Sequence, residues 1–251
     1  MQKGFFSRIF RIIQESNLLL EVLDARFPEL TRNRGIEKKI LNSEKKLVLV
    51  LNKSDLVTRE TLFREKKELE KIAPCVFLST KQRNGLRKLR EAIGKAINGK
   101  DSVVGIIGYP NTGKSSIINV LRGKSVAKTS SKAGFTRGEQ FVRISKNIML
   151  VDSPGIIPFA QKNEFELMLV NSKNAERLKD SETTALQLIQ WLLQKNPSVL
   201  KENFGIEETD SEKALEQIAF KKNRLVKGGL PDTQATAKIL IQDWQREKIK
   251  V

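Results

Sequence analysis

The sequence of 251 residues contains no histidine and only one cysteine. Histidine is the most frequent general base near neutral pH and the commonest metal ligand, so any catalysis must use backbone dipoles, lysine, hydroxyl groups, carboxylates and bound cations. A lone cysteine excludes an internal disulfide and a cysteine metal cluster. Cys75 lies in an apolar stretch, and we expect it to be buried filler.

Long apolar runs are also missing, since none approaches the roughly 20 residues that a bilayer-spanning helix needs. The apolar N-terminal stretch 5–13 is interrupted by Arg8 and Arg11 and lacks the pattern of a signal peptide. We expect it to pack on a sheet; the alternative is membrane association through an amphipathic segment. The sequence thus predicts a cytoplasmic protein without stable membrane association, with a monomer as the default state.

Acidic residues are scarce relative to basic ones. The formal net charge is +17 and the pI is near 10.0. An excess of this size on a small protein is typical of a polyanion partner. Nucleic acid is favoured over an acidic membrane surface.

Six short apolar segments predict buried strands. Helical patterns at 59–72 and 85–97 separate several of them, which predicts an α/β fold with a mostly parallel six-stranded sheet covered on both faces. The last two segments are joined by a short polar turn and should form an antiparallel hairpin. The predicted strands are 17–25, 46–52, 75–79, 103–108, 140–144 and 148–152.

After Pro158 the strand pattern stops and helical signals begin. Helices are predicted over 181–194, 211–227 and 232–248. Thr209 and Glu212 have capping-box spacing, Gly228-Gly229 should end the second helix, and Asp232 should cap the third. We therefore expect an α/β domain over 1–165 and a small all-α domain over 166–251.

A phosphate-binding loop is predicted at residues 108–115, Gly-Tyr-Pro-Asn-Thr-Gly-Lys-Ser, which follow an apolar strand and precede a helix predicted at 116–121. This GxxxxGK[ST] pattern in this context is typical of a P-loop. Backbone N–H groups and the helix N-terminus would hold the phosphates, with Lys114 on the β- and γ-phosphates and Ser115 on Mg²⁺. The predicted nucleotide contacts here are Asn111, Thr112, Gly113, Lys114, Ser115 and Ser116.

A guanine-specific motif precedes the P-loop. Residues 52–55 read Asn-Lys-Ser-Asp, an NKxD motif at a strand end. The Asp55 carboxylate can accept from guanine N1–H and the 2-amino group, Asn52 can contact the base edge, and the Lys53 stem can lie over the ring. The next predicted strand ends in Ser79-Thr80-Lys81, which is similar to the serine-alanine-lysine element that supports guanine.

A magnesium-binding DxxG motif follows the P-loop at residues 152–155. Asp152 would hold Mg²⁺ through water, and the Gly155 N–H would contact the γ-phosphate. Thr136, in a basic loop, is the candidate for the second hydroxyl on Mg²⁺, with Thr129 and Ser130 as competing candidates. Lys114, Thr136 and Gly155 form the expected catalytic set.

The order of these motifs is unusual, because the guanine motifs come before the P-loop. This order is typical of a circular permutation, in which the chain ends move to another exposed loop. The chain resembles the YlqF/YawG-type circularly permuted GTPases of the ribosome-biogenesis class over nearly its whole length. The resemblance includes Asp24-Ala25-Arg26-Phe27-Pro28 with Thr31-Arg32-Asn33, and a C-terminal part with 228–232 and Asp243-Trp244.

The resemblance implies a GTP-hydrolysing assembly factor for the large ribosomal subunit that binds rRNA or pre-ribosomal particles through its helical domain. The cluster Lys221, Lys222, Arg224 and Lys227 is the predicted phosphate-contact patch; the alternative is a solvated helix face. Two other functions stay open: a GTPase acting on another RNA, and an RNA-binding module that uses GTP as a structural ligand.

The stretch after DxxG lacks the glutamine that often orients the attacking water. We therefore expect slow intrinsic hydrolysis, stimulated by ribosomal particles and by K⁺. Asn111 would bind the K⁺, as several GTPase families with asparagine at this position do; the alternative is a role in the loop's turn only. Asp24 and Arg26 could contact nucleotide, switch residues or the particle, or form a structural ion pair.

Overall fold

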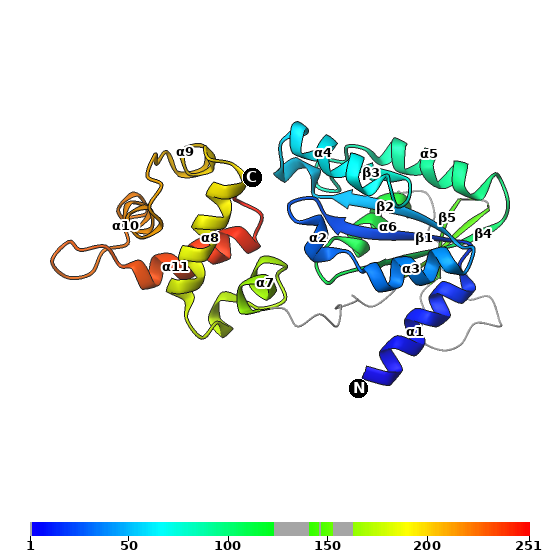
Figure 1. Cartoon of the computed structure of the whole chain (residues 1–251), viewed down its shortest axis with the longest axis horizontal. Coiled ribbons are helices and arrows are strands. Elements are labelled where there is room, and N and C mark those ends of the chain that lie inside the picture. The colour runs from blue at the N-terminus through cyan, green and yellow to red at the C-terminus, as the bar shows by residue number, and fades with distance from the viewer. Residues whose placement is uncertain (1, 123–140, 146, 153–162) are drawn as a thin grey trace. The chain divides into compact units, whose positions relative to one another are not determined.

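The computed structural model describes residues 2–122, 141–145, 147–152 and 163–251 (Figure 1). The chain divides into two compact units, 1–159 and 160–251. Position 165/166, where the sequence places the domain boundary, falls inside helix α7 (Glu164–Leu169). This helix starts with a capping box between Asn163 and Glu166, so its first turn belongs to the helical unit.

The first unit contains a six-stranded sheet of order β3-β2-β1-β4-β6-β5. The pairs that join β3, β2, β1, β4 and β6 are parallel, and β5 pairs antiparallel with β6. The predicted hairpin and the mostly parallel sheet are therefore confirmed. The strands are β1 (Leu18–Asp24), β2 (Lys46–Asn52), β3 (Cys75–Phe77), β4 (Ser102–Gly108), β5 (Phe141–Ser145) and β6 (Ile148–Asp152).

Both faces of the sheet are covered by helices, which explains why the central strands are continuous apolar runs. On one face, α1 (Gln2–Glu15), α3 (Arg34–Asn42) and α4 (Arg59–Leu69) pack on alternate residues such as Leu19, Leu49 and Leu51. On the other, α5 (Leu86–Ile97) and α6 (Lys114–Arg122) pack on Leu20, Val50 and Ile106. The doubly wound α/β arrangement is thus set by strand alternation.

The N-terminal helix α1 packs on this sheet through Ile9, Ile12 and Ile13, which are at most 4% exposed. This confirms the packing expected for that part of the stretch 5–13. Cys75 is buried, also as expected. Among the described residues, no helix is long and apolar enough to cross a membrane.

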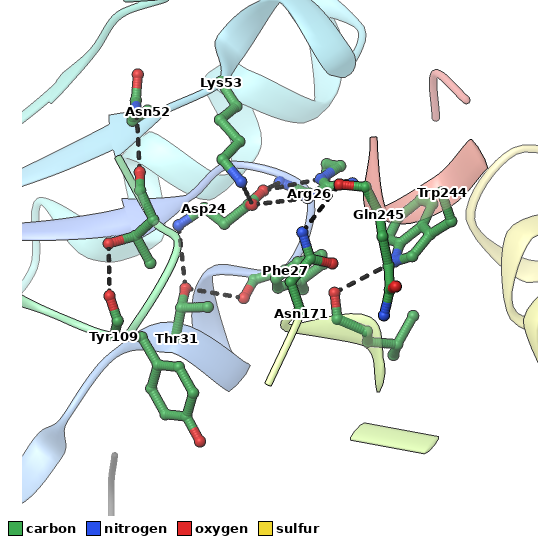
Figure 2. Close-up of polar contacts among 12 residues, drawn as sticks. Asp24, Arg26, Phe27, Thr31, Asn52, Lys53, Tyr109, Asn171, Trp244 and Gln245 are labelled. Atoms are coloured by element: carbon green, nitrogen blue, oxygen red, sulfur yellow. Dashed lines mark hydrogen bonds and ion pairs between the residues drawn. The ribbon is translucent and has the colours of Figure 1, made fainter. Parts of the chain in front are cut away.

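The second unit is helical and built around α8 (Ser181–Lys195), with α9 (Val199–Phe204), α10 (Ser211–Lys221) and α11 (Thr233–Gln245). Trp244 is fully buried, and its indole Nε1 donates to Leu169 O at 3.2 Å, which ties α11 to α7 (Figure 2). Asp232 accepts from Ala235 N at 2.9 Å and caps α11, as predicted.

Two details of this unit differ from the sequence prediction. Helix α10 ends at Lys221 rather than Lys227, because Asn223 takes the left-handed conformation and Arg224 N donates back to Ala219 O. Gly228 and Gly229 instead form the tip of the loop 223–231. The N-cap of α10 is Asp210, which accepts from Glu212 N and Lys213 N, and not Thr209.

Candidate functional site

The predicted nucleotide motifs meet where the order of the sheet reverses. The chain runs from β1 outward to β2 and β3 and then returns to β4 on the other side of β1. Such a switch point, outside the carboxyl ends of parallel strands, is the usual ligand crevice of an open α/β sheet. The P-loop leaves β4, the NKxD motif leaves β2, and Asp24 lies between them at the end of β1.

The P-loop has the backbone geometry that its glycines require. Gly108 has φ +146°, and a Cβ there would lie 2.5 Å from Val22 O. Asn111 adopts φ 61°, a left-handed turn position that asparagine tolerates. The loop closes on Tyr109 O, which accepts from Lys114 Nζ at 2.6 Å and from Thr112 Oγ1 at 3.0 Å. Ser115 and Ser116 are exposed in the first turn of α6.

The Asn52 side chain joins three motifs. Its Nδ2 donates to Thr112 O in the P-loop at 2.9 Å (Figure 2). Its Oδ1 accepts from Thr80 N at 3.3 Å. Gly113 lies so close that a Cβ on it would be 2.1 Å from Asn52 Nδ2. The structure thus brings together the NKxD loop, the Ser79–Lys81 loop and the P-loop, as expected from their strand ends.

The Lys53 side chain is held by a buried carboxylate. Its Nζ lies 2.9 Å from Asp24 Oδ2, and its backbone is left-handed with φ 62°. Asp24 also accepts from the Arg26 guanidinium at 2.9 and 3.0 Å (Figure 2). Burial favours the neutral acid, but the Arg26 and Lys53 cations lower the pKa of Asp24 to about 2. Of the roles left open for Asp24 and Arg26, the structure contains the ion pair.

The Asp55 carboxylate stands in a 3-10 turn, η1 (Ser54–Leu56). Its Oδ1 is buried and has no hydrogen-bond partner among the described residues. A buried acceptor without a partner is costly, so it marks a position where a ligand donor fits. Ser54 N donates to Leu78 O at 3.1 Å, which fixes this turn against the end of β3.

The Ser79–Lys81 segment is a tight turn. Ser79 is buried, its Oγ accepts from Gln82 N at 3.0 Å, and its backbone pairs with Asn84. Gly85 has φ +82°, and a Cβ there would lie 2.5 Å from Phe77 O, so the position accommodates only glycine. The turn therefore presents the Thr80 backbone to Asn52, while the Lys81 side chain is exposed.

The magnesium motif is described only in part. Asp152 ends β6 and is in register with Ile106 of β4, two residues before the P-loop begins. Thr136, Gly155, Thr129 and Ser130 lie outside the described residues. The described part contains no cluster of three or more acidic or cysteine side chains suited to a metal. A Mg²⁺ held by hydroxyl groups, one carboxylate and phosphates does not require such a cluster.

The 31–33 element is structural in its contacts. Thr31 Oγ1 accepts from Asp24 N at 3.1 Å, and Asn33 Oδ1 caps α3 by accepting from Ile36 N. Arg32 forms a two-bond ion pair with buried Glu37. The sequence does carry a signal for the Asp24 ion pair. Asp24 ends an apolar strand, and a charged residue that is buried there needs a partner.

The predicted RNA patch is divided by the structure. Lys221 Nζ donates to Gly205 O at 2.6 Å, and Lys222 Nζ to Asp243 Oδ2 at 2.8 Å. Arg224 and Lys227 are exposed on the 223–231 loop. The four residues therefore do not form one continuous helix face.

Two protein-family models match the sequence. The model described as RsgA GTPase matches residues 25–162, and the one described as 50S ribosome-binding GTPase matches residues 103–226.

Curated relatives match along nearly the whole chain. An uncharacterized GTP-binding protein of Methanocaldococcus jannaschii is 43% identical over 95% of this chain and 64% of its own length. Nucleolar GTP-binding protein 2 of Schizosaccharomyces pombe is 34% identical over 98% of this chain and 47% of its own length. The chain thus spans about half to two thirds of these relatives.

The fold is similar to that of solved structures of YlqF from T. maritima. The GDP-bound form gives a TM-score of 0.65 at 27% identity, covering 96% of this chain and 95% of that one. The GNP-bound form gives 0.65 at 26% identity, covering 98% and 94%.

Proposed function

Because the chain belongs to the family of circularly permuted GTPases, we propose that it binds and hydrolyses GTP as an assembly factor for the large ribosomal subunit. The observation that carries the proposal is the Asn52 side chain, which links the guanine-recognition loops to the P-loop. A nucleotide with a guanine base is a ligand that would contact all three loops at once. The names of the nucleolar relatives and the 50S description of one family model support the ribosomal part.

On the base side, Asp55 reads guanine. Its buried Oδ1 accepts a guanine N–H that an adenine cannot supply in that arrangement. Lys53, held at its Nζ by Asp24, lays its aliphatic stem along the ring. The backbone of Thr80, fixed by Asn52, lines the base site together with Ser79 and Lys81.

On the phosphate side, the backbone N–H groups from Asn111 to Ser116 and the N-terminus of α6 hold the anionic groups. Lys114 moves from Tyr109 O to the β- and γ-phosphates. Ser115, Thr136 and, through water, Asp152 would hold Mg²⁺, which would neutralise charge on the phosphates. The Gly155 N–H contacts the γ-phosphate.

Intrinsic hydrolysis is slow, because residues 155–158 read Gly-Ile-Ile-Pro and supply no amide side chain to orient water. Asn111 would hold a K⁺ that would neutralise charge near the phosphates, and contact with the ribosomal particle would raise the rate further. The left-handed backbone of Asn111 supports its turn-forming role equally, so the cation dependence must be measured.

The helical unit 160–251 contacts rRNA through Arg224 and Lys227, with Lys221 and Lys222 at the base of the same loop. The protein acts as a monomer in the cytoplasm. GTP hydrolysis releases contacts at Thr136 and Gly155 and so changes how the helical unit sits on RNA.

The test is GTP turnover in K⁺ and in Na⁺ buffer, with and without large ribosomal subunits, and with Lys114→Ala as the inactive control. The proposal expects stimulation by subunits and a higher rate in K⁺. A GTP turnover rate that subunits do not change in any buffer would remove the ribosomal assignment and leave the GTP site in place. Equal GTP turnover rates in K⁺ and Na⁺ would mean that Asn111 only stabilises the turn of the P-loop.

A further inference from the structure

The excess of basic residues is confined to the α/β unit. Residues 1–159 contain 31 Lys and Arg against 15 Asp and Glu, a net +16. Residues 160–251 contain 15 against 14, a net +1. Long-range attraction to a polyanion therefore comes from the α/β unit and not from the helical unit.

Within this unit the imbalance is large at α5 and its flanking turns. Residues 81–100 contain seven basic residues and one acidic residue, Glu91, and all seven basic residues are exposed. The α4 segment 59–71 is different, with five basic and four acidic residues. There Lys66 pairs with Glu70 and Lys71 with Glu68, while on α5 Arg87 lies 3.5 Å from Glu91. The basic residues near α5 are Lys81, Arg83, Arg87, Lys88, Arg90, Lys95 and Lys100.

Helix α5 also borders a groove of about 530 Å³ at the amino ends of β2 and β3. This end of the strands is opposite to the one that carries the nucleotide motifs. The floor is apolar, with Leu47, Val48, Pro74, Val76 and Ala92. Lysines border it from two elements, Lys45 and Lys46 before and at the start of β2, and Lys88 and Lys95 on α5. Cations around a concave, low-dielectric floor concentrate anions there.

We propose that this groove and the exposed face of α5 bind single-stranded RNA. The phosphates contact Arg87, Lys88 and Lys95, and unstacked bases lie on the apolar floor. An unpaired strand offers both an anionic backbone and apolar base faces, whereas a duplex hides its base faces in the stack. The proposal deepens the proposed function, and it rests on that function only for the ribosomal source of the RNA.

The test is binding of a fluorescent ten-nucleotide oligouridylate over a series of KCl concentrations. The α5 variant carries Arg87→Gln, Lys88→Gln and Lys95→Gln. The matched control carries Lys66→Gln, Lys67→Gln and Lys71→Gln on α4, which removes the same charge. We expect the α5 variant to bind at least about tenfold more weakly, with a log–log salt slope smaller by roughly 2, since each cation lost from a single strand removes about 0.7. The control should keep the parent slope.

Both variants should bind a fluorescent GDP analogue like the parent, which shows that they fold. Equal loss in the α4 control would show that only total charge matters and would overturn the site. Equal affinity for an RNA duplex of the same length would remove the role of the apolar floor. Competition by polyglutamate as strong as that by RNA would assign the groove to an acidic protein instead.

Large ribosomal subunits separate this proposal from the proposed function. If the parent binds oligouridylate through α5 and does not bind subunits, the RNA site stands and the ribosomal assignment fails. If the parent binds subunits, and the α5 variant binds subunits and oligouridylate as tightly as the parent does, the ribosomal assignment stands and the RNA site fails.

Discussion

The Lys53 ammonium lies 2.9 Å from the Asp24 carboxylate, and both side chains are at most 9% exposed. This pair joins the end of β1 to the guanine motif at the end of β2, two strands that are in register at Asp24 and Asn52. Arg26 shares the same carboxylate. Asp24, in the element that resembles the family's DARxP pattern, therefore holds the Lys53 side chain of the predicted guanine motif.

Asp24→Asn should destabilise the α/β unit by about 3–5 kcal/mol, because it removes the negative charge that two buried cations share. The pKa of Asp24 is lowered to about 2, so its contribution is present above the unfolded pKa near 4 and is lost as the pH falls towards 2. Urea unfolding at pH 7 and pH 3 measures this. Glu70→Gln, which removes a surface partner of Lys66, is the control and should cost less than about 1 kcal/mol. An Asp24→Asn variant as stable as the parent at pH 7 would contradict the role of the pair.

Gly113→Ala should weaken GTP and GDP binding by at least about tenfold. The new Cβ would lie 2.1 Å from Asn52 Nδ2 on a backbone with φ +98°, so both the P-loop and the NKxD loop must shift. Gly94→Ala is the matched control, since a Cβ there meets nothing within 4 Å in α5 and should be neutral or slightly stabilising. Titration with a fluorescent GDP analogue compares the two. Full affinity in Gly113→Ala would show that Asn52 does not link the loops in solution.

Asp55→Asn should lower GTP affinity by about a hundredfold or more, because the buried carboxylate oxygen that accepts from guanine becomes part of an amide. The amide N–H₂ can donate to the 2-oxo group of xanthine, so the variant should bind XTP better than GTP. Competition titrations with the two nucleotides give the preference. Asp101→Asn, at an exposed position, should leave it unchanged. A loss of affinity without any gain for XTP would place the guanine edge elsewhere.

Glu21→Gln should flatten the pH dependence of stability. Burial first, and then the nearby Glu37 carboxylate, raise the pKa of Glu21 well above its usual value of 4.5. A raised pKa gives stability that is complete below the unfolded pKa and is lost as the pH rises through the folded pKa. The neutral glutamine can still accept from Asn33 N, which the Glu21 side chain does at 2.7 Å.

Urea unfolding of the Glu21→Gln variant at pH 5 and pH 8 measures this. The parent should lose more stability than the variant between these two pH values, by about 1.4 kcal/mol for each unit of pKa shift that is crossed. Parallel profiles would mean that Glu21 is ionised throughout this range.

The arrangement of the candidate nucleotide site was largely predictable because each of its motifs is local. Each motif consists of three to eight consecutive residues at a strand end, and parallel strands bring these ends to one edge of the sheet. Lys46–Asn52 and Ile148–Asp152 have the predicted bounds, since strong apolar runs end there at polar turns. Helix α10 was predicted six residues too long, because Asn223 rather than the Gly-Gly pair takes the left-handed C-terminal position.

The sequence by itself determined the α/β class, the permuted order of the motifs and the residues that form the P-loop and the guanine motif. All of these depend on short-range pattern and on strand direction. Only the tertiary structure decided that Asp24 pairs with Lys53, that Asn52 links three loops, and that lysines from β2 and α5 border one groove. These contacts join residues that are about 30 to 60 positions apart, and such distances close only when the strands pair and the helices pack on them.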